Sequence, residues 1–384
     1  MAAEKERIYM ESRRGWLTLL TVSGALLLAI GMIAGMVIQQ KLYQAGEPVA
    51  EPAAEAYQEP AAPEAAGQQE EVVIPAPLTQ AHGALAVRGN QLVDQNGSSV
   101  QLKGISSHGL SWFPEYVSQE TIQFFRDEWG INVFRLAMYT AEYNGYCTGD
   151  DNNRRVLKNI VSEGVNACTN LGMYAIIDWH ILSDANPLEY IEESRLFFEE
   201  MAMRYQGYDN IIYEICNEPN GSTTWQDIKE YAGVIIPAIR QYDRDAVILV
   251  GTPNWSQYVD VAAADPLTGY DNIMYTLHFY ADTHREDLRN KLQAAHTAGL
   301  PVFISEFGVG DASGGGSING EEAQKWLSLL DEYHISYVVW NLSNKEETAA
   351  LLLPSCRKLK DFTMDDYSAS AKWIKDKLNT REVP

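Results

Sequence analysis

The sequence contains few cysteines, and their spacing excludes a cysteine-based metal site. Only four occur in the 384 residues, namely Cys147, Cys168, Cys216 and Cys356. None belongs to a CxxC pair, and none has metal-site spacing with a histidine. Cys168 lies in a helical pattern and Cys216 in a strand pattern, where a cysteine is typically a small buried apolar residue. A disulfide between Cys147 and Cys356 stays open, because the sequence does not give the distance between them.

Positive charge is also scarce. The chain has 29 lysine and arginine residues against 52 aspartate and glutamate residues, which gives a formal net charge of −23. Such a field repels phosphate backbones, so nucleic acid is excluded as a partner, and an anionic polysaccharide fits no better. A neutral polymer is compatible with this charge. The acidity is also typical of an exported protein that is kept soluble by its charge.

The N-terminal region predicts a membrane anchor. No charged residue occurs from Gly15 to Gln40. A helix over residues 16–38 would cover roughly 34 Å at about 1.5 Å per residue, enough to span a hydrocarbon core of about 30 Å. The apolar region of a secretory signal usually has only about 7–15 residues, which favours an uncleaved anchor over the alternative, a cleaved signal. The preceding basic residues predict that residues 1–15 are a cytoplasmic tail and that the rest of the chain lies outside the cell.

Residues 45–81 differ from the segments on either side. They are rich in alanine, proline and glutamate, and they show no apolar periodicity. This composition cannot bury enough apolar surface to offset chain entropy, so a disordered, extended and acidic linker is expected. Residues 82–380 then remain for one folded domain.

The rest of the chain alternates between strand and helix patterns after a hairpin over residues 84–94, whose Gly89-Asn90 pair suits a tight turn. Eight short apolar runs predict strands at 100–106, 132–139, 173–180, 210–217, 246–252, 273–280, 302–307 and 336–342. Segments with helical spacing lie at 121–129, 155–171, 187–205, 225–242, 256–264, 285–298, 321–333 and 366–378. Eight such units predict an α/β fold, a (β/α)8 TIM barrel. An open doubly wound sheet is the alternative, which the lack of a glycine-rich phosphate turn disfavours.

Two carboxylates stand where predicted strands four and seven end, Glu218 and Glu306. Glycoside hydrolysis needs such a pair, at a separation of about 5–5.5 Å for retention or about 6.5–9.5 Å for inversion, and the sequence does not give the separation. We expect Arg135 and Tyr280 to donate to Glu306 and to lower its pKa. Asn217 is expected to bond a sugar 2-hydroxyl.

Other polar and aromatic residues also follow the predicted strands. The histidines His108, His180 and His278 can donate to hydroxyls or orient the carboxylates. The indole rings of Trp112, Trp255 and Trp340 are candidate stacking surfaces for sugar rings, although each could equally be a core residue. Trp340, at the end of the last strand, is the strongest of these candidates.

Several stretches together resemble glycoside hydrolase family 5, in particular its bacterial endo-β-1,4-glucanase branch, from about Val87 to Leu378. They are LKGISSHGLSW (102–112), VFRLAMYT (133–140), IIDWHILSDANP (176–187), NIIYEICNEPNG (210–221), ILVGTPNWSQ (248–257), MYTLHFYADTH (274–284), FISEFG (303–308) and VVWNLSNKEE (338–347). Two positions depart from the branch. Phe307 replaces a usual tryptophan, and Thr252-Pro253-Asn254 replaces a glycine-richer turn, which could tilt Trp255.

The resemblance implies roles for individual residues. Glu218 would be the acid/base and Glu306 the nucleophile, with no metal or cofactor. The surrounding active-site set would be Arg135, His180, Asn217, His278, Tyr280 and Trp340. Glucose-binding residues on the non-reducing side would be His108, Trp112, Tyr139, Lys345 and Glu347, and Trp255 would lie on the leaving-group side.

The sequence therefore predicts a membrane-tethered, outward-facing and monomeric retaining endo-β-1,4-glucanase. The same barrel could instead act on mixed-linkage β-glucan, xyloglucan or mannan. Two alternatives of other classes are a non-catalytic surface glycan receptor and an anchored wall-remodelling or structural protein.

Overall fold

The computed structural model describes residues 82–378. The predicted cytoplasmic tail, the anchor over residues 16–38 and the linker over residues 45–81 lie outside the described residues, as do the last residues of the predicted domain. Across residues 82–378, every helix is too short or too polar to cross a membrane.

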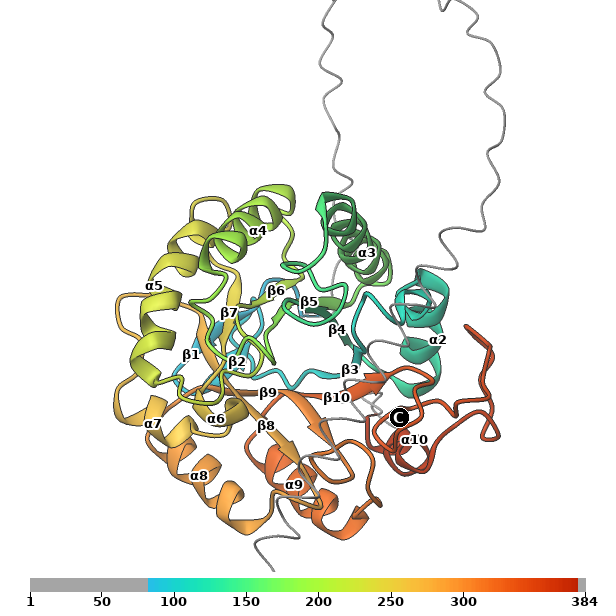
Figure 1. Ribbon diagram of the computed structural model, residues 1–384. Coiled ribbons are helices and arrows are strands. Elements are labelled where there is room, and N and C mark those ends of the chain that lie inside the picture. Colours follow the sequence, from blue (N-terminus) through green and yellow to red (C-terminus); the bar gives the residue numbers. More distant parts are fainter. Residues whose placement is uncertain (1–81, 379–384) are drawn as a thin grey trace, which may run out of the picture. The chain divides into compact units, whose positions relative to one another are not determined.

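The described part begins with a small antiparallel hairpin, as the sequence predicts. Strand β1 (Ala86–Arg88) pairs with β2 (Gln91–Val93), and Gly89 in the turn has a φ of 60°. Leu85 and Leu92 pack with inward-facing residues near the N-terminal ends of the larger strands that follow. The hairpin therefore closes that end of the barrel, and Figure 1 shows it behind the ring of strands.

The eight predicted strands form a closed, fully parallel barrel, with β10 pairing to both β9 and β3. The prediction of a (β/α)8 barrel is confirmed, and the open doubly wound sheet is wrong. The strands are β3 (Lys103–Ser107), β4 (Val133–Tyr139), β5 (Tyr174–His180), β6 (Ile211–Glu214), β7 (Val247–Val250), β8 (Ile273–Tyr280), β9 (Val302–Gly308) and β10 (Tyr337–Leu342). The largest departures are at β3, which begins at Lys103 rather than Val100, and at β6, which ends at Glu214 rather than Asn217.

Helices surround the barrel and cover the outer faces of its strands (Figure 1). They are α2 (Gln119–Trp129), α3 (Asp151–Asn170), α4 (Ile191–Arg204), α5 (Trp225–Arg240), α6 (Pro253–Ser256), α7 (Val259–Ala264), α8 (Glu286–Thr297), α9 (Gly320–Glu332) and α10 (Ala369–Ile374), with 3₁₀ turns η1 (Pro114–Tyr116) and η2 (Lys375–Lys377). Polar residues begin several of them. The longest, α3, is capped by Asp150, and α5 begins with a reciprocal capping box of Thr224 and Asp227.

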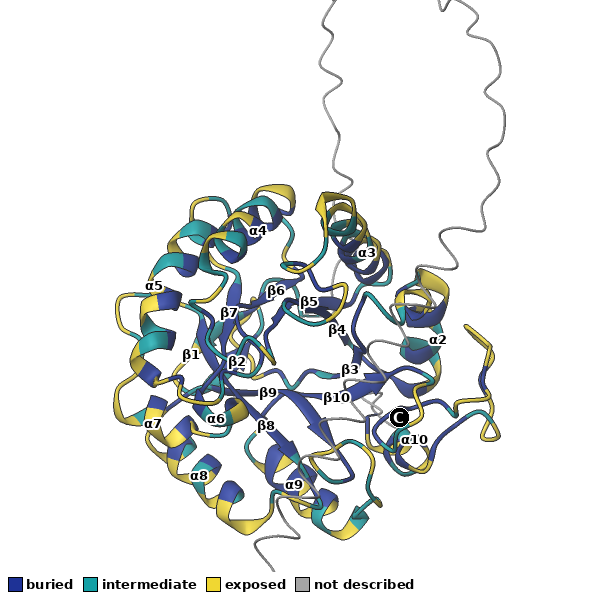
Figure 2. Cartoon of the chain, viewed as in Figure 1, coloured by how far each residue is buried: buried dark blue, intermediate teal, exposed yellow. Residues whose placement is uncertain are grey.

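Burial follows the layers expected of this architecture. The strands are buried on both faces, whereas the helices are buried toward the barrel and exposed outward (Figure 2). Besides several neutral polar residues and histidines, the buried strands contain an arginine and three carboxylic residues: Arg135, Asp178, Glu214 and Glu306. Burying a charge is costly unless it is paired, so these four residues need partners inside the barrel. Their presence indicates a functional site there rather than a core that only stabilises the fold.

Candidate active site

A cleft of about 510 Å³ opens among residues at or beyond the C-terminal ends of the barrel strands. Most of the predicted site residues line it: His108, Tyr139, His180, Glu218, Trp255, His278, Tyr280, Glu306, Trp340, Lys345 and Glu347. Arg135 and Asn217 lie fully buried beside these residues, and the ring of Trp112 packs against that of Tyr139. The structure thus brings the whole predicted set together from strands far apart in the sequence.

The two predicted carboxylates face one another in this cleft. Glu306 lies within β9, and Glu218 lies four residues after the end of β6. One oxygen of each carboxylate and one ring nitrogen of His278 all lie within 4.8 Å of one another. The pair therefore converges from the fourth and seventh barrel strands, as predicted.

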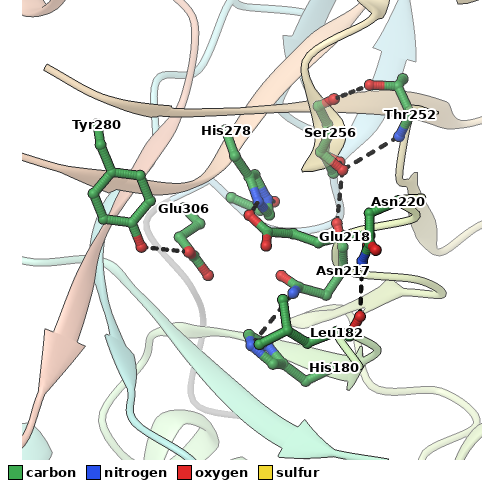
Figure 3. A network of polar contacts seen from close by, with 12 residues as sticks. His180, Leu182, Asn217, Glu218, Asn220, Thr252, Ser256, His278, Tyr280 and Glu306 are labelled. Atoms are coloured by element: carbon green, nitrogen blue, oxygen red, sulfur yellow. Dashed lines mark hydrogen bonds and ion pairs between the residues drawn. The ribbon is translucent and has the colours of Figure 1, made fainter. Parts of the chain in front are cut away.

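Glu306 is held by the two predicted donors. The Tyr280 hydroxyl donates to Oε1 at 2.7 Å, and Nη1 of Arg135 donates to Oε2 at 3.1 Å (Figure 3 draws the contact with Tyr280). The predicted lowering of the pKa is wrong, however. Burial and the neighbouring Glu218 carboxylate raise the pKa of Glu306, and together they outweigh the attraction of His278 and Arg135.

Glu218 is paired with His278. Nδ1 of His278 lies 3.0 Å from Oε1 of Glu218, and Nε2 lies 2.9 Å from the Ser305 hydroxyl. That hydroxyl in turn donates to Oε1 of Glu214 at 2.7 Å. Burial by itself lowers the pKa of His278, but hydrogen bonding to Glu214 and Glu218 raises it to about 9. Both ring nitrogens therefore face hydrogen-bonding partners, and the raised pKa favours the protonated ring.

Arg135 lies within β4, not at its end, and connects the buried acidic residues. Its Nε donates to Glu214 at 2.7 Å, and Nη2 lies 3.0 Å from Asp178. Nη2 also donates to Oδ1 of Asn217 at 2.6 Å. Together with its bond to Glu306, one fully buried guanidinium therefore serves three carboxylates and an amide.

Three residues of this network were not predicted as site residues: Asp178, Glu214 and Ser305. Burial raises the pKa of Glu214, but the adjacent Arg135 and His278 lower it to about 2, so it stays ionised. A signal was present in the sequence, because Glu214 interrupts the apolar run of β6. The prediction considered only strand ends, whereas an inward-facing residue deeper in a barrel also reaches the site.

The amide of Asn217 is engaged by protein groups. Besides accepting from Arg135, it donates through Nδ2 to the Ile181 carbonyl at 3.1 Å, and Nδ2 lies 3.3 Å from Nε2 of His180 (Figure 3). His180 is anchored from its other nitrogen, 2.6 Å from Asp178. The expected bond from Asn217 to a sugar hydroxyl stays a prediction.

Aromatic rings form one wall of the cleft. The rings of Trp340 and His180 are stacked, with centroids 5.1 Å apart, and Tyr139 lies 4.1 Å from His180. Trp112 packs beside two rings of this wall, with its centroid 4.7 Å from Tyr139 and 5.6 Å from His108, and its glucose-binding role stays a prediction. Beside the wall, Lys345 and Glu347 form an ion pair of 2.6 Å and contact His108. Burial and Lys345 lower the pKa of His108 to about 3, which keeps it neutral.

Two further expectations concern cysteines and metals. All four cysteines are free, so the disulfide that the sequence left open between Cys147 and Cys356 is not formed. Glu218, His278 and Glu306 are close enough together to reach one cation. Both ring nitrogens of His278 already contact protein groups, Glu218 and the Ser305 hydroxyl, and the expected absence of a metal or cofactor stays a prediction.

Comparisons with known proteins agree on one family. The profile of the family described as Cellulase (glycosyl hydrolase family 5) matches residues 93–346. Endoglucanase A of Butyrivibrio fibrisolvens is 52% identical over 299 residues, covering 78% of this chain and 69% of the relative. An endoglucanase of Clostridium saccharobutylicum is 47% identical over 304 residues, covering 79% of this chain and 66% of the relative.

Solved structures agree with these relatives. The cellulase Cel5C_n superposes with a TM-score of 0.74 at 42% identity, covering 78% of this chain and 93% of that chain. The catalytic domain of Thermobifida fusca endoglucanase Cel5A (E5) gives 0.74 at 35% identity, covering 78% of this chain and 98% of that chain.

Proposed function

The chain belongs to the cellulases of glycosyl hydrolase family 5, and from this premise we propose that it is a retaining endo-β-1,4-glucanase. Its substrate would be cellulose or a related β-glucan, cut at internal bonds. The observation that carries the proposal is the carboxylate pair in the cleft, with oxygens of Glu218 and Glu306 within 4.8 Å of one another. An inverting enzyme needs about 6.5–9.5 Å between its carboxyl groups to admit a water, so this pair suits direct attack.

The donors around each carboxylate decide their roles. Two carboxylates this close favour sharing one proton, which is the reason that Glu218 raises the pKa of Glu306. Glu306 accepts from two donors, Arg135 and Tyr280, whereas Glu218 faces one, His278, so the charged form is favoured more at Glu306. We therefore assign Glu306 as the nucleophile and Glu218 as the residue that carries the proton.

The first step forms a covalent intermediate. A Glu306 oxygen attacks the anomeric carbon, the bond from that carbon to the glycosidic oxygen breaks, and Glu218 gives its proton to the departing oxygen. In the second step Glu218 removes a proton from a water that attacks the same carbon, and Glu306 leaves. Two inversions at one carbon give net retention.

The walls of the cleft supply the sugar-binding surfaces. We assign the wall of Tyr139, Trp340 and His108, with the Lys345–Glu347 ion pair, to glucose units on the non-reducing side. The half-exposed Trp255 is assigned to the leaving-group side. Action as a monomer is part of the proposal, and gel filtration of the purified chain tests it.

A substrate panel tests this function. We expect the purified chain to lower the viscosity of carboxymethyl cellulose rapidly while releasing few reducing ends, because internal cuts shorten a polymer before they generate many ends. Barley β-glucan, xyloglucan, mannan and xylan, assayed alongside, separate the neighbouring specificities. A folded protein that hydrolyses none of these polymers would instead favour a surface glycan receptor or a wall-remodelling role.

We further propose that residues 16–38 anchor the enzyme in the cell membrane with the barrel outside. The uncharged, apolar composition of the segment and the basic residues before it support this. Activity is expected in the membrane fraction, with release only by detergent or by proteolysis within residues 45–81. A mature protein that begins after residue 40 would contradict the anchor and indicate a cleaved signal.

A further inference from the structure

The segment after β7 contains three consecutive residues in a left-handed backbone conformation. Asn254, Trp255 and Ser256 have φ angles of 59°, 55° and 54°, and none of them is glycine. Residues with side chains rarely adopt this conformation, and it persists only where the surroundings hold it. The strained segment carries Trp255, whose side chain is 42% exposed and lines the cleft.

The fully buried hydroxyl of Ser256 holds this segment. It donates to the carbonyl oxygen of Asn217 at 2.6 Å. It also accepts from the Thr276 hydroxyl at 3.1 Å and from the backbone N–H of Thr252 at 3.3 Å. Figure 3 shows this hydroxyl between Thr252 and Asn217. A second bond lies one residue earlier, where the N–H of Trp255 donates to the carbonyl of Pro219 at 3.0 Å.

These two hydrogen bonds hold the residues immediately before and after Glu218, the proposed acid/base residue. Asn217 and Pro219 are the residues on either side of Glu218, and their carbonyls accept from Ser256 and Trp255 respectively. Strand β6 has ended at Glu214, and the backbone around Glu218 is held by separate hydrogen bonds. The N–H of Asn217 donates to the Trp179 carbonyl at 3.2 Å, and Nδ2 of Asn220 donates to the Glu218 carbonyl at 2.9 Å. The two bonds from the strained segment hold the carbonyls on either side of Glu218.

We infer that Ser256 is a positioning residue for leaving-group protonation: its hydroxyl fastens the backbone of Glu218 to the segment that carries Trp255. The inference rests on the proposed function and deepens it. The residue that stacks on the departing sugar and the residue that protonates it then keep one fixed separation. A displaced Glu218 backbone would lose alignment with the glycosidic oxygen, while Glu306, on the other side of the cleft, would stay in place.

Leaving-group dependence tests this role in the full-length chain. Ser256→Ala is expected to lower kcat/KM on phenyl β-cellobioside by at least about 10-fold, because general acid catalysis typically contributes about 10²–10⁴ and its geometry would be degraded. On 2,4-dinitrophenyl β-cellobioside, whose leaving group needs no proton, the change should stay within about twofold. A merely structural role would lower both rates together.

Two more variants complete the design. Ser256→Gly also lacks the hydroxyl but adopts a left-handed backbone without steric cost, so it should fold and show the same selective loss even if Ser256→Ala does not fold. Thr252→Val is the matched control. It removes another buried hydroxyl of this loop, one that donates to the Thr276 carbonyl at 3.1 Å, and should leave the ratio of the two rates unchanged.

The possible outcomes distinguish a failure of this inference from a failure of the proposed function. A wild-type ratio in Ser256→Gly, or equal losses on both substrates in the Ser256 variants, would overturn the positioning role while leaving the glucanase intact. A wild-type chain that hydrolyses neither cellobioside nor any polymer of the panel would overturn both.

Discussion

Glu306→Gln is expected to abolish hydrolysis of every substrate, with kcat falling by more than about 10⁴-fold, beyond what an acid/base group typically contributes. The amide cannot form the covalent ester, and no other carboxylate stands at this position of the cleft. Activated aryl cellobiosides should therefore fail as completely as the polymer. The measurement is kcat on both, with folding checked by thermal melting.

Glu218→Gln should behave differently, and the contrast identifies the roles. Polymer hydrolysis should be nearly lost, because the leaving sugar needs a proton. A 2,4-dinitrophenyl cellobioside should still release its phenol in a burst, after which the glycosyl-enzyme accumulates for want of a base. Mass spectrometry should find that adduct on Glu306. Glu332→Gln, on the exposed side of α9, is the control for the chemical change itself. An active Glu306→Gln beside an inert Glu218→Gln would reverse the assignment.

Arg135→Met is expected to lower the free energy of unfolding by about 3–5 kcal/mol and to remove activity, because it leaves Asp178, Glu214 and Glu306 buried without their shared cation. Urea unfolding and kcat give the two effects separately. Arg135→Lys keeps the charge, but a single ammonium cannot replace the planar fork that bonds Glu214, Asn217 and Glu306 together, so activity should still fall sharply.

The matched control for this prediction is Arg195→Met on α4. Its ion pair with Glu199 is a partly exposed one at 2.8 Å, and such pairs are worth only about 0.2–1 kcal/mol. If Arg135→Met proved as stable as Arg195→Met, the buried carboxylates could not be charged in the native state, and the network described above would need a different protonation.

The positions of the barrel strands could be predicted because a strand buried on both faces must be a short apolar run. The residues at which these strands end could not be predicted as closely. The residues after Glu214, Ile215 and Cys216, are as buried and apolar as the strand before them. Hydrophobicity therefore continues past the point where the ladder of β6 stops, and composition alone does not mark the end.

The convergence of Glu218, Glu306 and their neighbours could be predicted because their motifs follow predicted strands. The sequence could not show how deeply each of these residues is buried. Glu306 had its two expected donors, but the degree of burial that raises its pKa depends on packing from the whole barrel. Trp112 illustrates the same limit, since its contacts with Tyr139 and His108 depend on how the loops beyond the strands fold.

The hairpin of β1 and β2 closes the barrel at the end opposite to the cleft, and the described chain begins there. Whatever precedes residue 82 is consequently joined to the face that does not meet substrate. A fibre bound in the cleft therefore does not pass over residue 82. Under the proposed anchoring, the point of attachment and the working face lie at opposite ends of the barrel.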